Sequence, residues 1–224
     1  MKDLFNIKDD VVVITGGTGI LGREIGSYLA SQHAHVVLLG RKEEVGSDIE
    51  SEIRKEGGDA VFMKCDVLNQ ESVEAVCERV LALYGKVDAL LNAAGGNMPG
   101  ATISPAGTLF DVKVEDFQKV LNLNLTGTVI PTQVFLKPMV EAGKGSIVNF
   151  TSMAAFRPLT RVMGYAAAKA GVSNFTAFLS NEVATKFSPD IRVNAIATVA
   201  KNFFISNIFK CLIYFFSLVR EVTC

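Results

Sequence analysis

Short runs of apolar and β-branched residues alternate along the chain with longer stretches in which apolar positions recur at helical spacing. The apolar runs predict strands at residues 11–15, 35–40, 60–67, 87–95, 145–152 and 191–197. The stretches between them predict helices near residues 20–32, 43–57, 70–84, 114–141 and 162–187. Because the runs are apolar throughout, the strands should be buried on both faces, as in a parallel sheet covered by helices. Right-handed crossovers then predict a doubly wound α/β domain of three αβα layers, the Rossmann-type fold, over residues 1–197.

Composition narrows the class of protein. The chain has 224 residues, of which 49% are hydrophobic and 20% charged, with a formal net charge of −1. These values fit one globular domain and offer no basic surface for nucleic acid. The four cysteines (Cys65, Cys77, Cys211 and Cys224) and two histidines show no metal-ligand spacing, so we expect no metal site and reduced thiols. Residues 1–10 lack the apolar run of a signal peptide, which favours a cytoplasmic protein.

A glycine-rich loop, "TGGTGILG", follows the first predicted strand and opens the first predicted helix. Glycine permits a tight turn and lets backbone amides approach a pyrophosphate at a helix N-terminus. In this strand–loop–helix context the loop predicts a dinucleotide site, the alternative being a structural turn. The residues that we expect at the cofactor are Thr15, Gly16, Gly17, Gly19, Ile20, Leu21 and Gly22.

The end of the second predicted strand bears on which dinucleotide binds. NAD-specific folds of this kind place an acidic residue there for the ribose 2′-hydroxyl, whereas this chain has Gly40, Arg41 and Lys42. A guanidinium would bind a 2′-phosphate, which favours NADP(H) and leaves NAD(H) as the alternative. The two basic residues could equally begin a solvated helix. Asp66 and Asn92 end the next two predicted strands on the same rim.

A serine, a tyrosine and a lysine form the candidate catalytic group. Tyr165 and Lys169 lie four residues apart and therefore on one helix face, and Ser152 ends the fifth predicted strand. A tyrosine hydroxyl is a weak acid at pH 7, but a neighbouring ammonium favours the phenolate and makes proton transfer easier. Such a pair can protonate a carbonyl oxygen while hydride reaches the carbon, and the serine can hydrogen-bond the same oxygen.

The glycine loop, "CDV", "NAAG", "NLNLTG", "GSIVNFTS" and "YAAAK" occur in the order found in the short-chain dehydrogenase/reductase family, which the chain resembles over residues 1–197. The resemblance implies that Tyr165 is the acid/base, that Lys169 activates it and holds the nicotinamide ribose, and that Ser152 orients the substrate. It implies that Asn124 holds a water in a proton relay. It also implies cofactor contacts from Asp66, Val67, Asn92, Ala93, Ala94 and Gly95. The chain departs from the family pattern at Ile20 and Ala93, where a glycine and a second asparagine are usual.

"AAGGNMPGATISP" and the stretch from Ser152 to Lys169 are similar to family members that act as D-mannonate oxidoreductases (D-fructuronate reductases). The resemblance implies a keto-acid or hydroxy-acid substrate of the sugar-acid type, with 3-oxoacyl or gluconate-type keto substrates as alternatives. Arg157 and Arg161 could bind its carboxylate, although either could be a plain surface charge. Asn97 is a candidate contact for sugar hydroxyls. The family also implies a homo-oligomer, dimer or tetramer, built on the helices near 114–141 and 162–187.

Residues 198–224 break the resemblance. Thr198 and Val199 stand where the family has Pro-Gly, and an apolar tail follows, with "CLIYFFSLV" too short for the roughly 20 residues of a membrane span. We therefore expect an atypical C-terminal end that lacks the family's substrate lid and last strand, the alternative being a divergent helix. On that expectation the chain is either a working reductase or an inactive one that at most binds nucleotide.

Overall fold

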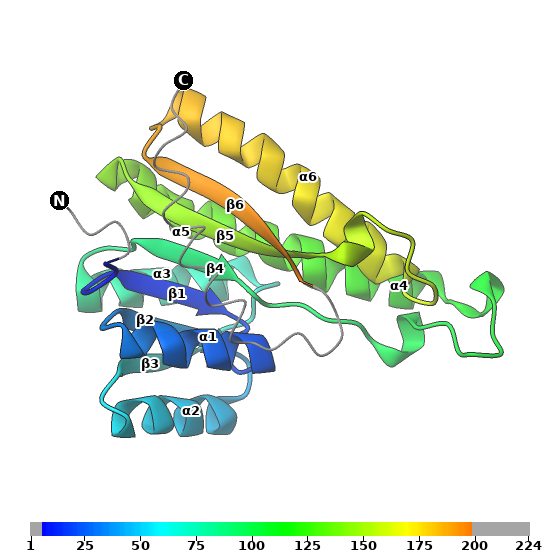
Figure 1. Cartoon of the computed structure of the whole chain (residues 1–224), viewed down its shortest axis with the longest axis horizontal. Helices are drawn as coiled ribbons and strands as arrows, with labels where there is room; N and C mark the ends of the chain where they lie inside the picture. Colours follow the sequence, from blue (N-terminus) through cyan, green and yellow to red (C-terminus); the bar gives the residue numbers. More distant parts are fainter. Residues whose placement is uncertain (1–5, 199–224) are drawn as a thin grey trace.

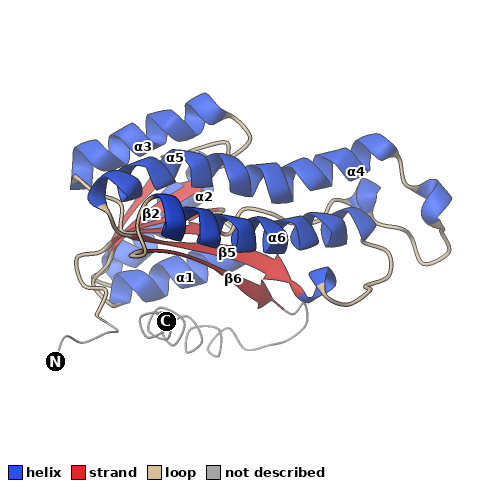
Figure 2. Ribbon diagram, turned by 90° about the horizontal axis from the view of Figure 1, so that it is seen from above, coloured by secondary structure: helices blue, strands red, loops and turns tan. Residues whose placement is uncertain are grey.

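The computed structural model describes residues 6–198, and these form one parallel sheet with helices on both faces (Figures 1 and 2). The strands are β1 (Val11–Thr15), β2 (His35–Gly40), β3 (Asp59–Lys64), β4 (Ala89–Asn92), β5 (Gly145–Ser152) and β6 (Ile191–Thr198). The α-helices are α1 (Ile20–Ser31), α2 (Glu43–Lys55), α3 (Gln70–Tyr84), α4 (Val114–Leu121), α5 (Gly127–Ala142) and α6 (Met163–Lys186). The predicted three-layer Rossmann-type fold is confirmed.

Two hydrophobic clusters fill the spaces between the sheet and the two helical layers. Alternate residues of β1 point to opposite sides, with Val11 and Val13 in one cluster and Val12 and Ile14 in the other. The first cluster packs against α3, α5 and α6, and the second packs against α1 and α2. Burial on both faces explains why the strands are apolar throughout and show no alternation.

The strand order β3-β2-β1-β4-β5-β6 places β1 between β2 and β4. The chain winds outward from β1 in one direction through β3 and in the other through β6, so the winding reverses between β1 and β4. At such a switch point the loops that leave the two strands diverge and open a crevice at their carboxyl ends. The last paired residues there are Thr15 and Asn92, which lead directly into the glycine loop and the "AAGG" segment.

Two predicted strands are shorter than expected. β3 ends at Lys64 because Asp66 begins a turn, in which its carboxylate accepts the backbone N–H of Leu68. β4 ends at Asn92 because the N–H of Ala93 turns back to the carbonyl of Leu91. In both cases apolar residues continue past the last ladder bond, so hydrophobicity alone overestimates the strand. The expectations for residues 198–224, Cys211 and Cys224 included, lie outside the described residues except for Thr198, which ends β6.

The predicted helix over residues 114–141 consists of α4 and α5 joined by a π-helical turn, η3 (Asn122–Thr126). The Asn124 side chain donates to the carbonyl of Val120, which a regular α-helix would give to the backbone N–H of residue 124. π-turns of this kind are frequent at functional sites. The apolar periodicity carries no sign of the interruption.

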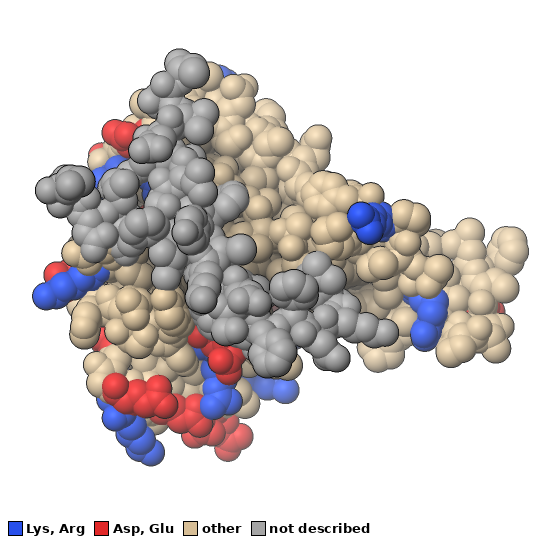
Figure 3. All heavy atoms as spheres, in the orientation of Figure 1, with Lys and Arg blue, Asp and Glu red and all other residues tan. Residues whose placement is uncertain are grey.

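An arm extends from the carboxyl end of the sheet and contains the short 3₁₀ turns η1 (Pro99–Ala101) and η2 (Leu109–Asp111) before α4 begins (Figure 1). Phe110 in η2 is 94% exposed. On the face in Figure 3, acidic and basic side chains intermix below the sheet near α2, whereas the arm carries few charges. The arm and the loop between β5 and α6 flank the open end of the crevice.

Candidate active site

The glycine loop turns sharply between β1 and α1 and leaves the start of α1 open. Gly16 adopts a left-handed conformation with φ 67°, and a Cβ there would stand 2.8 Å from the Ala93 carbonyl oxygen. Gly22 allows an even closer approach, because its Cβ would lie 2.4 Å from the carbonyl oxygen of Gly16. Gly19 caps α1 without a side-chain hydrogen bond, and the first turn holds no acidic residue. The first backbone N–H groups of α1 are therefore suited to a phosphate.

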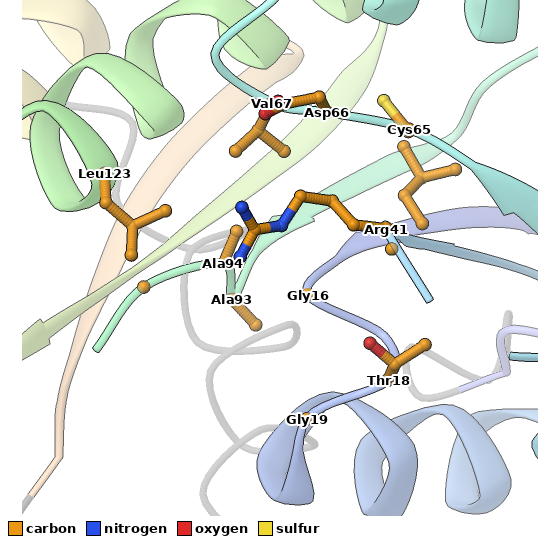
Figure 4. Close-up of a pocket in the computed structure, with 13 residues that line it drawn as sticks. Gly16, Thr18, Gly19, Arg41, Cys65, Asp66, Val67, Ala93, Ala94 and Leu123 are labelled. Atoms are coloured by element: carbon orange, nitrogen blue, oxygen red, sulfur yellow. The ribbon is translucent and has the colours of Figure 1, made fainter. Parts of the chain in front are cut away.

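An outer cavity of about 220 Å³ lies between this loop and the ends of β2, β3 and β4 (Figure 4). Its lining includes predicted cofactor residues from four segments, namely Gly16, Gly19, Arg41, Asp66, Val67, Ala93, Ala94 and Gly95. Arg41 directs its guanidinium toward the centre of the cavity (Figure 4) and has no hydrogen bond or ion pair with residues 6–198. A cation without a protein partner at the rim of an anion site can bind a ligand phosphate without first breaking another contact.

An inner cavity of about 230 Å³ continues from the outer one, since both are lined by Gly16, Gly19, Ala93 and Gly95. Its walls include Tyr165 and Lys169 of α6, Phe150 and Thr151 of β5, and Ile20, Leu21 and Gly22 of the glycine loop. Ile20 is 81% exposed there, so the departure from the family's glycine places an apolar side chain at the cavity wall.

Lys169 is buried, with 5% of its surface exposed, and its ammonium donates to the Phe150 carbonyl oxygen at 2.6 Å. The Nζ atom lies 5.6 Å from the centroid of the Tyr165 ring, which confirms that the two side chains are neighbours on one helix face. Burial lowers the pKa of the Lys169 ammonium to about 8. At neutral pH the site thus holds a cation that is poorly solvated and close to the tyrosine.

Ser152 ends β5 and is buried, and its Oγ accepts the backbone N–H of Ala154 at 3.2 Å. It does not line either cavity. Since the contact uses the oxygen as an acceptor, the hydroxyl hydrogen stays available for another acceptor.

Asn124 is fully buried in the π-turn and binds the segment after β4. Its side-chain nitrogen donates to the Gly96 carbonyl at 2.7 Å, and its side-chain oxygen accepts the Gly96 N–H at 3.0 Å. A Cβ on Gly95 would stand 2.6 Å from that oxygen and 3.5 Å from the Lys169 ammonium. Gly95, which lines the inner cavity together with Lys169, therefore lies close to both the Asn124 oxygen and the Lys169 ammonium.

Four other residues predicted to bind the cofactor line neither cavity. The Asn92 amide donates to Thr132 and Asn149, both at 2.9 Å, within the sheet–helix interface. Thr15 is buried and its hydroxyl accepts the Ala94 N–H at 3.1 Å. Gly17 packs over Leu38, where a Cβ would come within 2.8 Å, and lines neither cavity. Lys42 is exposed and begins α2 as its N-cap residue, outside both cavities.

Besides Ser152, the three other predicted substrate residues lie in the loops at the open end, outside both cavities. Asn97 donates to the Thr102 hydroxyl at 2.5 Å. Arg161 donates through Nε to the Ile103 carbonyl at 2.6 Å. Arg157 is exposed, and its guanidinium has no partner within residues 6–198.

Sequence reasoning missed several residues that the structure brings to the crevice. Thr18, Leu39, Gly40, Cys65 and Leu123 line the outer cavity, and Gly96, Phe150, Thr151 and Thr198 line the inner one. The consecutive glycines at 95 and 96 were a usable signal, because a segment that passes an asparagine this closely has no room for side chains. Phe150 acts through its backbone carbonyl, which leaves no signal in the sequence.

Residues 6–198 offer neither a metal site nor a membrane-spanning helix. They contain no group of three or more His, Cys, Asp or Glu side chains arranged to hold a metal ion. No helix within the same range is long and apolar enough to cross a membrane.

The chain is similar to known oxidoreductases. A family model for the short chain dehydrogenase matches residues 10–202. The uncharacterized oxidoreductase UxuB of Bacillus subtilis is 38% identical over 200 residues, which are 86% of this chain and 71% of the relative. The crystal structure of a putative D-mannonate oxidoreductase from Haemophilus influenza, with bound NAD, is 35% identical with a TM-score of 0.81. The match covers 88% of this chain and 74% of that one. A metagenomic short-chain oxidoreductase in complex with NADP is 26% identical with a TM-score of 0.80, and the match covers 93% and 92% of the two chains.

Proposed function

The chain belongs to the short-chain dehydrogenase family and is an NAD(P)-dependent oxidoreductase, and we propose that it interconverts a keto sugar acid and its alcohol, of the fructuronate and mannonate type. The observation that carries the proposal is the position of Tyr165 and Lys169 on one wall of the inner cavity. The sugar-acid substrate is supported by the similarity to a putative D-mannonate oxidoreductase and by an unpaired arginine at the open end of the crevice.

The crevice fits a nicotinamide dinucleotide. The uncapped start of α1 suits the pyrophosphate, the outer cavity suits the adenosine half, and Lys169 at the inner cavity would hold the nicotinamide ribose. When bound, the nicotinamide supplies or accepts the hydride. The Lys169 ammonium has three N–H groups and donates one of them to the Phe150 carbonyl, so two remain for the ribose hydroxyls.

Proton transfer is the task of the side chains. In the direction of reduction, Tyr165 gives its hydroxyl proton to the carbonyl oxygen while the carbonyl carbon receives the hydride, so that C=O becomes CH–OH. The phenolate that remains is stabilised by the buried ammonium of Lys169, whose effect is strong because little water screens it. Ser152 donates its hydroxyl hydrogen to the substrate oxygen and so fixes the carbonyl beside Tyr165. In the reverse direction the phenolate removes the alcohol proton.

We propose that the tyrosine is reprotonated through a water at Asn124. Both N–H groups of the Asn124 side chain are bonded, to the carbonyls of Gly96 and Val120, and its oxygen accepts the Gly96 N–H, so we place the water at the backbone carbonyl. That carbonyl accepts the Thr128 hydroxyl at 2.9 Å, and a carbonyl oxygen has two lone pairs. The carbonyl lies in the π-turn, and such turns are frequent at functional sites.

We also propose NADP(H) as the preferred cofactor, because Arg41 is unpaired at the outer cavity and no acid stands at position 40. For the substrate carboxylate we propose Arg157, with Asn97 near the sugar hydroxyls. A cytoplasmic homo-oligomer remains our proposal as well. It is supported by an exposed stripe of small residues on α6 at Ala167, Ala170 and Ala177, next to Phe178, which is 61% exposed.

The test begins with parallel fluorescence titrations of the chain with NADPH and NADH, followed by turnover assays with fructuronate and mannonate. We expect saturable cofactor binding and reduction of fructuronate. Tyr165→Phe should bind cofactor with unchanged affinity and lose at least a hundredfold in kcat, since it lacks only the transferable proton. Binding without turnover of any sugar acid would exclude the proposed substrate. Turnover that survives Tyr165→Phe would exclude the proposed acid.

A further inference from the structure

Two loops at the open end of the crevice are joined by a pair of hydrogen bonds between Arg161 and Ile103. The Ile103 N–H donates to the Arg161 carbonyl oxygen at 2.9 Å, and Arg161 Nε donates to the Ile103 carbonyl oxygen at 2.6 Å. One loop follows β4 and the other precedes α6. Within residues 6–198 no other hydrogen bond links these two loops. We call this contact the Arg161–Ile103 bridge.

The backbone of Arg161 is in the left-handed region, with φ 74°. A residue with a long side chain seldom adopts this conformation and keeps it only where surrounding contacts enforce it. Here both the carbonyl and the side chain of Arg161 are held by the same partner residue. The strain therefore marks a contact that fixes the loop.

The bridge connects the loop before α6, the helix that carries Tyr165, to the segment after β4, which contacts Asn124. On one side, Arg161 lies four residues before Tyr165 and immediately before Val162, the N-cap of α6. On the other side, the segment of Ile103 begins at Gly95 and Gly96, which line the inner cavity and lie against the buried Asn124. A shift of either loop at the bridge would move the start of α6 relative to the segment after β4.

From this geometry we infer that Arg161 is a positioning residue, which holds Tyr165 in place through the Arg161–Ile103 bridge. The inference rests on the proposed function. It gives the two loop arginines different tasks, because Nε of Arg161 is already used inside the protein whereas the guanidinium of Arg157 is unpaired. What matters at position 161 is then a donor at the ε position, and what matters at position 157 is a positive charge.

Substitutions separate these tasks. In glutamine the amide nitrogen is reached through the same number of bonds as Nε of arginine, so Arg161→Gln keeps the donor and removes the charge. Arg161→Lys keeps the charge and loses the ε donor, and Arg161→Met loses both. We expect Arg161→Lys and Arg161→Met to lower kcat for fructuronate at least tenfold, with KM changed less than threefold. Arg161→Gln should restore kcat to within threefold of the unaltered chain.

The matched variants at the other arginine should show the opposite order. Arg157→Lys should keep KM within about fivefold, and Arg157→Gln should raise it at least tenfold with little change in kcat. The inference is overturned if Arg161→Lys is active and Arg161→Gln is not, because the charge would then be the functional feature. The inference is also overturned if Arg161→Gln, Arg161→Lys and Arg161→Met have the same kcat, because the ε donor would then have no effect.

Hydrogen exchange of the Ile103 amide tests the bridge without any substrate. Arg161→Met should speed exchange at Ile103 at least tenfold relative to Arg161→Gln, while the affinity for NADPH stays within twofold in both. Failure of the proposed substrate would leave this exchange result intact, so the two proposals fail independently. Identical exchange in the two variants would show that the side-chain hydrogen bond does not hold the loop.

Discussion

Replacing Lys169 with methionine should abolish catalysis and at the same time remove a source of instability. Lys169 is 5% exposed and forms no ion pair with the described part of the chain, so its ammonium is buried without a counter-charge. Methionine has nearly the same length and no charge, and it can occupy the same space. The variant therefore removes the cost of burying the ammonium, together with its hydrogen bond to the Phe150 carbonyl.

The size and sign of the effect follow from the pKa. Burial lowers the pKa of Lys169 to about 8, against about 10.5 for an ordinary lysine. A gap of about 2.5 between these pKa values corresponds to about 3 kcal/mol of destabilisation while both states are protonated, that is, below pH 8. Above pH 8 the folded state loses its proton before the unfolded state does, so the penalty falls by about 1.4 kcal/mol per pH unit and vanishes near pH 10.5. Methionine also leaves the Phe150 carbonyl without this donor, which costs about 1–3 kcal/mol at every pH.

Urea unfolding of the two proteins at pH 7, 8, 9 and 10 measures the difference directly. At pH 7 the variant should be equal in stability or up to about 2 kcal/mol more stable, as the two terms partly cancel. Relative to the variant, the unaltered chain should gain about 1 kcal/mol between pH 8 and pH 9, where the folded state is still partly protonated, and about 1.4 kcal/mol between pH 9 and pH 10. Lys144→Met removes an exposed ammonium and should show no such trend. A stability difference for Lys169→Met that is constant from pH 7 to pH 10 would refute the reasoning.

Two further substitutions test the outer cavity by the same NADPH and NADH titrations. Arg41→Glu should weaken NADPH binding about ten- to a hundredfold, the loss expected for one charge-assisted hydrogen bond, and should change NADH binding less than threefold; equal losses would contradict a 2′-phosphate contact. Gly40→Asp should weaken both cofactors, because a Cβ at position 40 would stand 2.8 Å from the Thr18 side chain. Adding Thr18→Ala should then give at least a tenfold preference for NADH. A preference for NADH from Gly40→Asp alone would show that Thr18 does not limit this position.

The half of the site that binds the dinucleotide could be predicted because short turns build it. The glycine loop leaves β1 and enters α1 within a few residues, so finding the strand and the helix places Gly16 and Gly22 closely. Arg41 and Asp66 follow the ends of β2 and β3 at the same edge of a parallel sheet, and that geometry puts them in one cavity. Tyr165 and Lys169 lie on one helix, whose period fixes their relation.

The other half depends on contacts between segments that are distant in the chain. Nothing local shows that Asn124 interrupts its helix with a π-turn, or that its amide binds Gly96. The hydrogen bond from Arg161 to Ile103 joins residues 58 positions apart, and an arginine in a loop has the same appearance in sequence whether it binds a ligand or a carbonyl. Such assignments require the fold, because they depend on which loops meet.

Lys169 links α6 to β5 at the centre of the proposed active site. Lys169 is bound to β5 twice, since its ammonium donates to Phe150 and its backbone carbonyl accepts the Thr151 hydroxyl at 2.9 Å. The backbone contact fixes α6 against the strand, and the side-chain contact holds the ammonium beside the same strand. A cation held in this way stabilises a developing phenolate without reorganising, which is the condition under which electrostatic catalysis is most effective. The instability expected from Lys169 and the activity proposed for Tyr165 thus have one physical cause, and a variant that relieves the first should lose the second.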